Sequence, residues 1–285
     1  MSRSYLFVPA DSKRKLANAS DTDADALILD LEDSVAPDAR PAARELAADF
    51  VTDRDDVWVR INPLDSDDAQ ADLAAVSAAA PAGIVLPKPR SADDVVSLAA
   101  QLDKLEALHG IAAGQIKIMA LCTERPEALF TLHSYIGATP RLSALSWGGE
   151  DLSSALGASA NRSADGEWLP TYEMARSLCL CAAAAAEVAA IDTVFTDYRD
   201  MDGLARYATN ARRDGFSGML AIHPAQIDVI NRAFMPTAEE IERAEQIIAL
   251  FDDNPGAGTL GLDGAMIDRP HRAQAERLLA LAKKQ

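Results

Sequence analysis

The sequence contains only three cysteines, which are Cys122, Cys179 and Cys181. An odd and small number of cysteines does not form a disulfide framework, so we expect reduced thiols and a cytoplasmic protein. Long apolar runs are also missing. The alanine-rich stretch at residues 182–186, for example, ends at Glu187. A membrane span needs roughly 18 or more consecutive apolar residues, so we expect none. The apolar run at residues 6–9 is too short for a signal peptide.

Basic residues are scarce as well, since 27 Lys and Arg face 44 Asp and Glu, for a formal net charge of −17. Binding to nucleic acid or to anionic lipid relies on clustered Lys and Arg, so we expect neither partner. Apolar residues make up 49% and charged residues 25% of the chain, which is typical of a globular protein and excludes a largely disordered one. A length of 285 residues accommodates one large barrel or two medium domains.

Short β-prone segments alternate with helix-like segments along the chain. Eight nearly all-apolar segments are typical of parallel strands that are buried on both faces. They are residues 5–8, 26–31, 57–61, 83–86, 116–121, 142–147, 191–195 and 218–222. Between them, segments rich in Ala, Leu, Glu and Arg, such as 92–108 and 172–190, predict helices. Eight such repeats favour an α/β fold of the (β/α)8 TIM-barrel type, with a doubly wound open sheet as the alternative.

The segment after the eighth predicted strand has a different character. Thr237, followed three residues later by Glu240, predicts the start of a helix. Residues 252–258 then combine Asp, Asn, Pro and Gly, which indicates a flexible hinge. We therefore expect a TIM-barrel catalytic domain over residues 1–251 and a C-terminal helical lid or arm over residues 252–285.

Polar residues gather at the C-terminal ends of the predicted strands. In a TIM barrel these ends form one rim, where the active sites of such enzymes lie. The polar residues at the ends of the second to eighth strands include Asp30, Glu32, Asp33, Arg60, Asn62, Lys88, Thr123, Glu124, Glu150, Asp151, Asp197 and His223. Carboxylates, Arg, Lys and His clustered at one rim indicate a functional site.

Glu124 and Asp151 are the most informative of these residues. They are one strand–helix repeat apart, so they are expected at the ends of neighbouring strands, which lie about 4.8 Å apart. Two carboxylates that close repel each other unless a cation lies between them. Oxygen ligands without a nearby Cys or His cluster favour Mg²⁺ over zinc. The alternative for Asp151 is that it caps the helix that follows.

Arg60 ends a strand whose other residues are apolar. A guanidinium group at that position can bind a carboxylate or a carbonyl oxygen with two hydrogen bonds. The alternative is a structural ion pair with Asp30 or Glu32, and the two roles can coexist.

Three other patterns are rejected as sites. Residues 256–261 match G-x-G-x-x-G, but they neither follow a predicted strand nor open a helix, as a dinucleotide site requires. Cys179 and Cys181 lie in a predicted helix and are interpreted as core residues. The histidines do not have metal-ligand spacing; they are His109, His133, His223 and His271.

Together with segments elsewhere in the chain, the rim residues resemble the citrate lyase β-subunit-like family of CoA-ester lyases, within the HpcH/HpaI aldolase superfamily. The likeness follows the chain in order. It is carried by residues 3–9, 29–35, 59–62, 86–88, 123–124, 149–152, 191–193, 221–226 and 262–270. Each motif alone has low specificity, but the ordered set is specific.

The resemblance implies a Mg²⁺-dependent TIM barrel that forms a homotrimer or a hexamer. It also implies that the enzyme cleaves or forms a carbon–carbon bond in a short 3-hydroxyacyl-CoA ester such as citramalyl-CoA, malyl-CoA or citryl-CoA. For citramalyl-CoA and malyl-CoA the products are acetyl-CoA and a 2-keto acid.

The resemblance also assigns roles to individual residues. Glu124 and Asp151 resemble the metal ligands, with Glu124 also at the substrate, and Arg60 resembles the residue that holds the acyl or keto-acid oxygens. Asp268 resembles a lid aspartate that reaches the site of a neighbouring subunit and transfers a proton. The residues that resemble CoA contacts are Phe7, Arg14, Ile222 and His223.

The sequence departs from the family pattern at a few positions. Ala10 stands where relatives often have Gly, and Met219 and Ala265 stand where they often have Lys. The resemblance therefore implies fewer basic contacts to the CoA phosphates, and we expect the basic cluster at residues 13–15 to serve in their place.

Three alternatives to a CoA-ester lyase remain open. The first is a metal-dependent aldolase that acts on free 2-keto acids without CoA. The second is a malyl-CoA-type thioesterase, and the third is a citrate lyase β subunit that works only with an acyl-carrier partner. The sequence leaves open the acyl group and the direction of the reaction.

Overall fold

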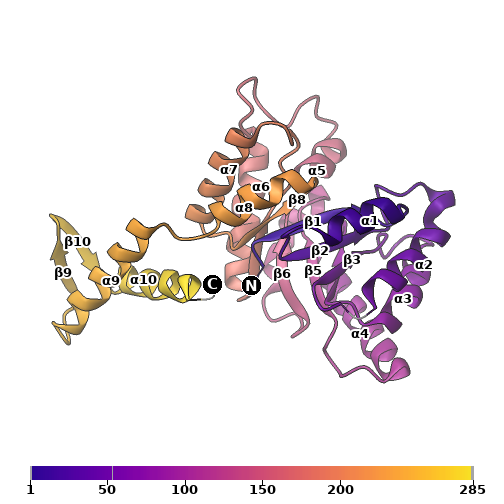
Figure 1. Ribbon diagram of the computed structural model, residues 1–285, viewed down its shortest axis with the longest axis horizontal. Coiled ribbons are helices and arrows are strands. Elements are labelled where there is room, and N and C mark those ends of the chain that lie inside the picture. The colour runs from indigo at the N-terminus through magenta and orange to yellow at the C-terminus, as the bar shows by residue number, and fades with distance from the viewer. Residues whose placement is uncertain (1, 53, 284–285) are drawn as a thin grey trace. The chain divides into compact units, whose positions relative to one another are not determined.

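The computed structural model describes residues 2–52 and 54–283, and its first part is a closed barrel of eight parallel strands (Figure 1). The strands are β1 (Ser4–Pro9), β2 (Ala26–Asp30), β3 (Val57–Arg60), β4 (Gly83–Leu86), β5 (Lys117–Leu121), β6 (Leu142–Ser146), β7 (Ala189–Asp192) and β8 (Gly218–Ala221). Each strand pairs with the next, and β1 pairs with β8 to close the ring. The TIM-barrel prediction is confirmed, and the closure excludes the open sheet.

The predicted strands match the observed ones closely, except for the seventh. Strand β7 begins and ends earlier than predicted, because the chain leaves the sheet after Asp192. There the Asp192 carboxylate accepts a hydrogen bond from the Thr193 N–H at 2.8 Å, so this amide does not continue the ladder.

Helices connect the strands. The α-helices of this part are α1 (Lys13–Ser20), α2 (Arg40–Val51), α3 (Ala69–Val76), α4 (Ala92–His109), α5 (Gly149–Leu156), α6 (Pro170–Ala185), α7 (Met201–Asp214) and α8 (Ile227–Ala233). After β5, two 3₁₀ segments, η3 (Pro126–Phe130) and η4 (Leu132–Tyr135), take the place of an α-helix. Within the described ranges, none of the helices has both the length and the apolar character needed to cross a bilayer.

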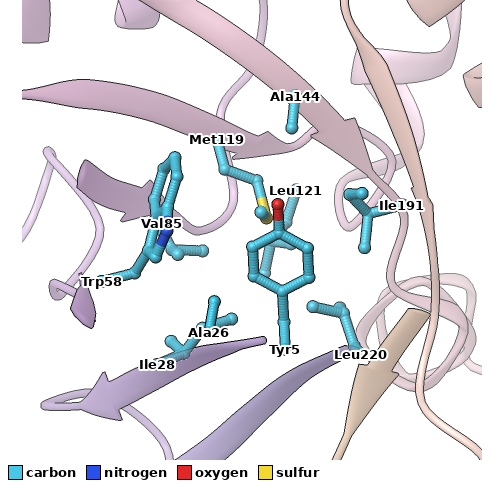
Figure 2. Close-up of a cluster of buried hydrophobic side chains, with 10 residues drawn as sticks. All are labelled: Tyr5, Ala26, Ile28, Trp58, Val85, Met119, Leu121, Ala144, Ile191 and Leu220. Atoms are coloured by element: carbon cyan, nitrogen blue, oxygen red, sulfur yellow. The ribbon is translucent and has the colours of Figure 1, made fainter. Parts of the chain in front are cut away.

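The barrel interior is filled by side chains that point inward from the strands. Figure 2 shows Tyr5 and Trp58 in this cluster. Their rings meet edge-on, with the ring centroids 6.2 Å apart and an interplanar angle of 74°. Its buried members are Tyr5, Ala26, Ile28, Trp58, Val85, Met119, Leu121, Ala144, Ile191 and Leu220. Gly83 makes room for the indole, because a Cβ atom at that position would lie 2.2 Å from Trp58 Cζ3.

The alternation of inward and outward residues continues to the rim. Ala26 and Ile28 point inward, so Asp30 two residues later shares their face, and Arg60 shares the face of Trp58 in the same way. The register of β2 on β3 pairs Asp30 with Arg60 directly. The strand period therefore places a carboxylate and a guanidinium group side by side at the mouth of the barrel.

Of the two cysteines predicted as core residues, only Cys179 is buried. Cys181 is exposed, because residues two apart on a helix face different directions. Cys179 Sγ lies 3.6 Å from the Sγ atom of Cys122, which follows β5.

The chain divides into two compact units, Met1–Asn231 and Arg232–Gln285. The second unit contains α9 (Ala238–Asp252), the antiparallel hairpin of β9 (Thr259–Leu262) and β10 (Ala265–Asp268), and α10 (Arg269–Ala282). Its small core consists of Ala244, Ile247, Phe251, Ile267 and Ala275.

The division differs from the predicted domain boundary at residues 251 and 252. Helix α9 belongs with the later elements, because its apolar face shares a core with β10 and α10. The segment 252–258 therefore joins α9 to β9 inside one compact unit and is not a joint between the units. The hairpin was not predicted, although its turn carries an Asp-Gly pair, Asp263 and Gly264, which adopts left-handed φ angles of 49° and 79°.

Glu106 and Arg141 form a buried ion pair next to the start of β6. Burial by itself raises the pKa of Glu106, but hydrogen bonds from Arg141 and from the N–H groups of Ile116 and Gly114 outweigh it and lower the pKa from 4.5 to about 2. The ion pair thus stabilises the fold above the unfolded-state pKa, and this contribution is lost as the pH falls from about 4.5 to about 2.

We expect Glu106→Gln to lower the free energy of unfolding by about 3 kcal/mol at neutral pH. We also expect the variant to lose less stability than the wild type between pH 5 and pH 2, because the titrating carboxylate is gone. Urea unfolding at a series of pH values measures both effects. Equal losses of stability in the two proteins over this range would contradict the prediction.

Candidate active site at the barrel mouth

Arg60 and Asp30 form an ion pair at the bottom of the site. Arg60 Nε and Nη2 donate to the two carboxylate oxygens of Asp30, both at 2.7 Å, and Nη1 lies 3.0 Å from Glu32 Oε2. Burial lowers the pKa of Arg60, but Asp30 and Glu32 raise it overall, so the guanidinium stays charged. The guanidinium also lies over the Phe7 ring, with Cζ 4.7 Å from the ring centroid. The predicted structural ion pair is therefore present, and it fixes the direction in which Nη1 points.

Glu32 lies at the centre of the charged groups. Besides Arg60, it accepts a hydrogen bond from Lys88 Nζ at 2.5 Å. Burial raises the pKa of Glu32 to about 7, even though Arg60 and Lys88 oppose this effect. Glu32 therefore changes its protonation state near neutral pH, which is a property of groups that transfer protons.

Glu124 follows β5 and is buried, with 3% of its surface exposed. The backbone N–H of Lys88 donates to Glu124 Oε2 at 2.6 Å. Burial raises the pKa of Glu124 well above its ordinary value, and the negative charges of Asp151 and Glu32 add to this. A Cβ atom at Gly148 would lie 2.6 Å from Glu124 Cγ, so the glycine leaves the space that the carboxylate occupies.

Asp151 lies in the first turn of α5, where the helix dipole favours a negative charge. The alternative role as a helix cap is wrong, because Gly148 is the N-cap residue of α5 and no side chain caps it. Asp151 Oδ1 instead lies 3.2 Å from Lys88 Nζ. The negative charge of Asp151 also contributes to the raised pKa of Glu124, so the two carboxylates lie within electrostatic range of each other.

The balance of charge indicates that the site can hold a cation. When all are ionised, five carboxylates face Arg60 and Lys88, which leaves three negative charges in excess. These carboxylates are Asp30, Glu32, Asp33, Glu124 and Asp151. Within residues 2–52 and 54–283, no group of three or more His, Cys, Asp or Glu side chains forms a complete metal site. A pair of carboxylates with other positions left for water and substrate suits Mg²⁺.

The predicted CoA-contact residues lie in two places. Phe7 is half-buried beside the core cluster and under Arg60, and Arg14 is exposed on α1. Ile222 and His223 are exposed after β8, where the imidazole stacks on Tyr198 with centroids 4.7 Å apart. His223 Nδ1 also accepts from the Ala225 N–H at 3.1 Å, so the turn after β8 is held in a defined shape.

Asp268 belongs to the C-terminal unit, where it is the N-cap residue of α10. Its Oδ1 lies 2.5 Å from His271 Nδ1, and the two residues form a capping box. The contact with His271 lowers the pKa of Asp268, so the side chain is a carboxylate at neutral pH.

Four residues of the cluster were not among the predicted catalytic or ligand residues: Asp30, Glu32, Asp33 and Lys88. Asp30 and Glu32 were predicted only as polar residues of the rim and as ion-pair partners of Arg60, and the other two only as polar residues of the rim. The contacts that distinguish them are long-range, because Lys88 and Glu32 are 56 residues apart. A local sequence signal for Lys88 is its position directly after Pro87, at the end of the predicted strand 83–86.

The fold and the site define a class of protein, namely a TIM-barrel enzyme with an acidic mouth. The comparisons with known proteins agree. The HpcH/HpaI aldolase/citrate lyase family matches residues 3–224, and the chain belongs to this family. It is a carbon–carbon lyase of the oxo-acid-lyase class.

Curated relatives span almost the whole chain. The citrate lyase subunit β-like protein of Mycobacterium tuberculosis is 35% identical over 278 residues, which cover 98% of this chain and 94% of that protein. The mitochondrial citramalyl-CoA lyase of Rattus norvegicus is 32% identical, covering 98% of this chain and 86% of that protein. The (3S)-malyl-CoA thioesterase of Cereibacter sphaeroides is 32% identical, covering 99% and 94%.

Solved structures are similar over most of the chain or nearly all of it. CitE from Mycobacterium tuberculosis in complex with magnesium, acetoacetate and coenzyme A has a TM-score of 0.85 and 32% identity, covering 99% of this chain and 98% of that one. The citrate lyase β subunit of the same organism, complexed with oxaloacetate and magnesium, has a TM-score of 0.73 and 34% identity, covering 82% and 97%. The first of these structures contains magnesium, acetoacetate and coenzyme A, and the second contains magnesium and oxaloacetate.

Proposed function

We propose that the protein is a Mg²⁺-dependent lyase that cleaves or forms a short 3-hydroxyacyl-CoA, such as citramalyl-CoA or malyl-CoA. The products of cleavage are acetyl-CoA and a 2-keto acid. The observation that carries this proposal is the buried carboxylate of Glu124 beside Asp151 and Arg60 at the barrel mouth, with its excess of negative charge. The CoA and oxo acids bound by its relatives support the substrate class.

Glu124 and Asp151 are the residues that would hold Mg²⁺. A divalent ion held by them would supply Lewis-acid chemistry, by which it would polarise the oxygen that becomes the ketone. Arg60 stabilises the negative charge of the thioester enolate through Nη1, because Asp30 engages its other two donor groups and holds the guanidinium in place.

The reaction needs a group that moves a proton. Cleavage removes the proton of the 3-hydroxyl group, breaks the C2–C3 bond and then places a proton on the enolate carbon. We assign this transfer to Asp268. Because the contact with His271 keeps Asp268 ionised, it first accepts the proton that it later delivers.

The proposal includes an assembly. We infer a homotrimer or a hexamer in which the C-terminal unit brings Asp268 to the site of a neighbouring subunit. Light scattering of the purified protein measures the mass of the assembly. A monomer with full activity would contradict this assignment of Asp268.

The experiment that tests the function is a cleavage assay on citramalyl-CoA, malyl-CoA and citryl-CoA, with Mg²⁺ and with EDTA. Acetyl-CoA and a 2-keto acid in equal amounts, formed only with Mg²⁺, support the proposal. Free CoA without a keto acid identifies a thioesterase, and cleavage of free hydroxy-keto acids without CoA identifies an aldolase. Activity that appears only with an acyl-carrier protein identifies a citrate lyase β subunit.

We expect Asp268→Asn to lower kcat by about 10²–10⁴-fold, because the amide cannot accept the proton. The affinity for Mg²⁺, measured by titration calorimetry, is expected to stay within about twofold, since Asp268 is not an assigned metal ligand. Asp263→Asn is a matched control, because Asp263 lies in the hairpin turn of the same unit and is exposed. An unchanged kcat for Asp268→Asn would remove the assignment.

A further inference from the structure

The ammonium group of Lys88 lies among the carboxylates of the site. Its Nζ atom is 2.5 Å from Glu32 Oε1, 3.2 Å from Asp33 Oδ1 and 3.2 Å from Asp151 Oδ1. Glu32 is 3% exposed and Lys88 is 22% exposed at the side chain, so water screens these contacts only in part. Lys88 therefore neutralises a metal-ligand candidate, Asp151, and a buried neighbour, Glu32, at the same time.

The backbone of Lys88 has an unusual conformation. Its φ angle of 52° is in the left-handed region, which a residue with a side chain rarely adopts and which costs free energy. This conformation allows the N–H to donate to Glu124 at 2.6 Å while the side chain of the same residue reaches Asp151. One residue thus contacts both proposed metal ligands, through its backbone and through its side chain.

We propose that Lys88 is a positioning residue that serves as the resident counter-ion of the site: its ammonium group holds Asp151 and Glu32 in place without metal and lowers the affinity of the site for Mg²⁺. This inference rests on the proposed function. Lys88 keeps the cluster ordered between turnovers, and Mg²⁺ has to compete with the ammonium group for Asp151.

The physical reason is Coulombic. A cation bound between Glu124 and Asp151 lies within a few ångströms of an ammonium group that contacts Asp151, and like charges repel strongly at that range in a partly buried site. Removing the ammonium charge relieves the repulsion and frees Asp151 to bind the metal. It also leaves Glu32 with Arg60 as its remaining cationic partner among the described residues, so the metal-free protein loses stability.

The test measures Mg²⁺ binding by titration calorimetry and thermal unfolding, with and without Mg²⁺, for Lys88→Met. Methionine has a similar length but no charge. Lys88→Gly is the second variant, because glycine tolerates the left-handed backbone, keeps the N–H that contacts Glu124 and removes the ammonium group. Lys88→Arg keeps the charge. Lys104→Met is the matched control, since it removes the same charge from an exposed position on α4.

We expect Lys88→Met and Lys88→Gly to bind Mg²⁺ at least about tenfold more tightly than the wild type, and Mg²⁺ to raise the unfolding midpoint of Lys88→Met by more. For Lys88→Arg and Lys104→Met, the dissociation constant for Mg²⁺ is expected to stay within about threefold of the wild-type value, which is about half a logarithmic unit. Unchanged or weaker binding by both neutral variants overturns the inference and leaves the lyase proposal standing. No Mg²⁺ binding by the wild type overturns the proposed metal site and the inference together.

Discussion

Replacement of Glu124 by Gln is expected to lower the Mg²⁺-dependent cleavage rate by about a thousandfold or more. Glutamine has the same size and can still accept the hydrogen bond from the Lys88 N–H, but it brings no charge to a cation. Loss of several kcal/mol of metal-assisted stabilisation corresponds to a rate loss of about this size. Steady-state kinetics over a range of Mg²⁺ concentrations measures the effect.

The Glu124→Gln variant is also expected to be at least as stable as the wild type in the absence of Mg²⁺. Because burial and the charges of Asp151 and Glu32 raise the pKa of Glu124, the ionised side chain is unfavourable in the metal-free fold. The unfolding midpoint without Mg²⁺ at neutral pH is therefore expected to equal or exceed that of the wild type. Glu127→Gln is the matched control, since Glu127 is exposed three residues further along, and it is expected to keep full activity. Full metal-dependent turnover by Glu124→Gln would remove Glu124 as a ligand.

Replacement of Arg60 by Lys is expected to lower kcat/KM by about a hundredfold and to destabilise the fold by about 3–5 kcal/mol. Lysine cannot bind Asp30 with two parallel hydrogen bonds and reach Glu32 at the same time. Asp30 is 2% exposed, so the loss leaves a buried carboxylate incompletely paired. Kinetics and urea unfolding measure the two effects separately.

A control variant separates catalysis from stability in this experiment. Arg141 pairs with the buried Glu106 before the start of β6, at the end of the barrel opposite the mouth. Arg141→Lys is expected to lose stability to a similar degree and to keep kcat/KM within about threefold, half a logarithmic unit. If Arg60→Lys and Arg141→Lys lose activity equally, Arg60 has a structural role and not a catalytic one.

Much of the barrel could be predicted because its signals are local. Each buried strand is an apolar run, and the period of two along β2 and β3 carries the inward face from Ile28 and Trp58 to Asp30 and Arg60. The capping box of Thr237 and Glu240 likewise marked the start of α9 correctly. Local patterns of this kind need no knowledge of distant contacts.

Other features could not be predicted because they depend on packing between distant segments. The division of the chain before α9 follows from the core that α9 shares with β10 and α10, which no local pattern reveals. The chain also leaves β7 at Asp192 for a tertiary reason. Its carboxylate is buried between Trp147 Nε1 and the Arg176 guanidinium, at 2.7 and 2.8 Å, and these contacts set its position.

The sequence by itself determined that the chain forms a TIM barrel of the HpcH/HpaI aldolase/citrate lyase family with its acids at one rim. The reason is that strand periodicity and the ordered motifs are local features of the sequence. Only the tertiary structure decided that Arg60 is engaged by Asp30, that Asp151 does not cap its helix, and that Lys88 lies among the carboxylates. These features depend on side chains that are 30 to 63 residues apart in sequence and meet only when the barrel closes. Their charges then act on one another across a few ångströms of partly buried space.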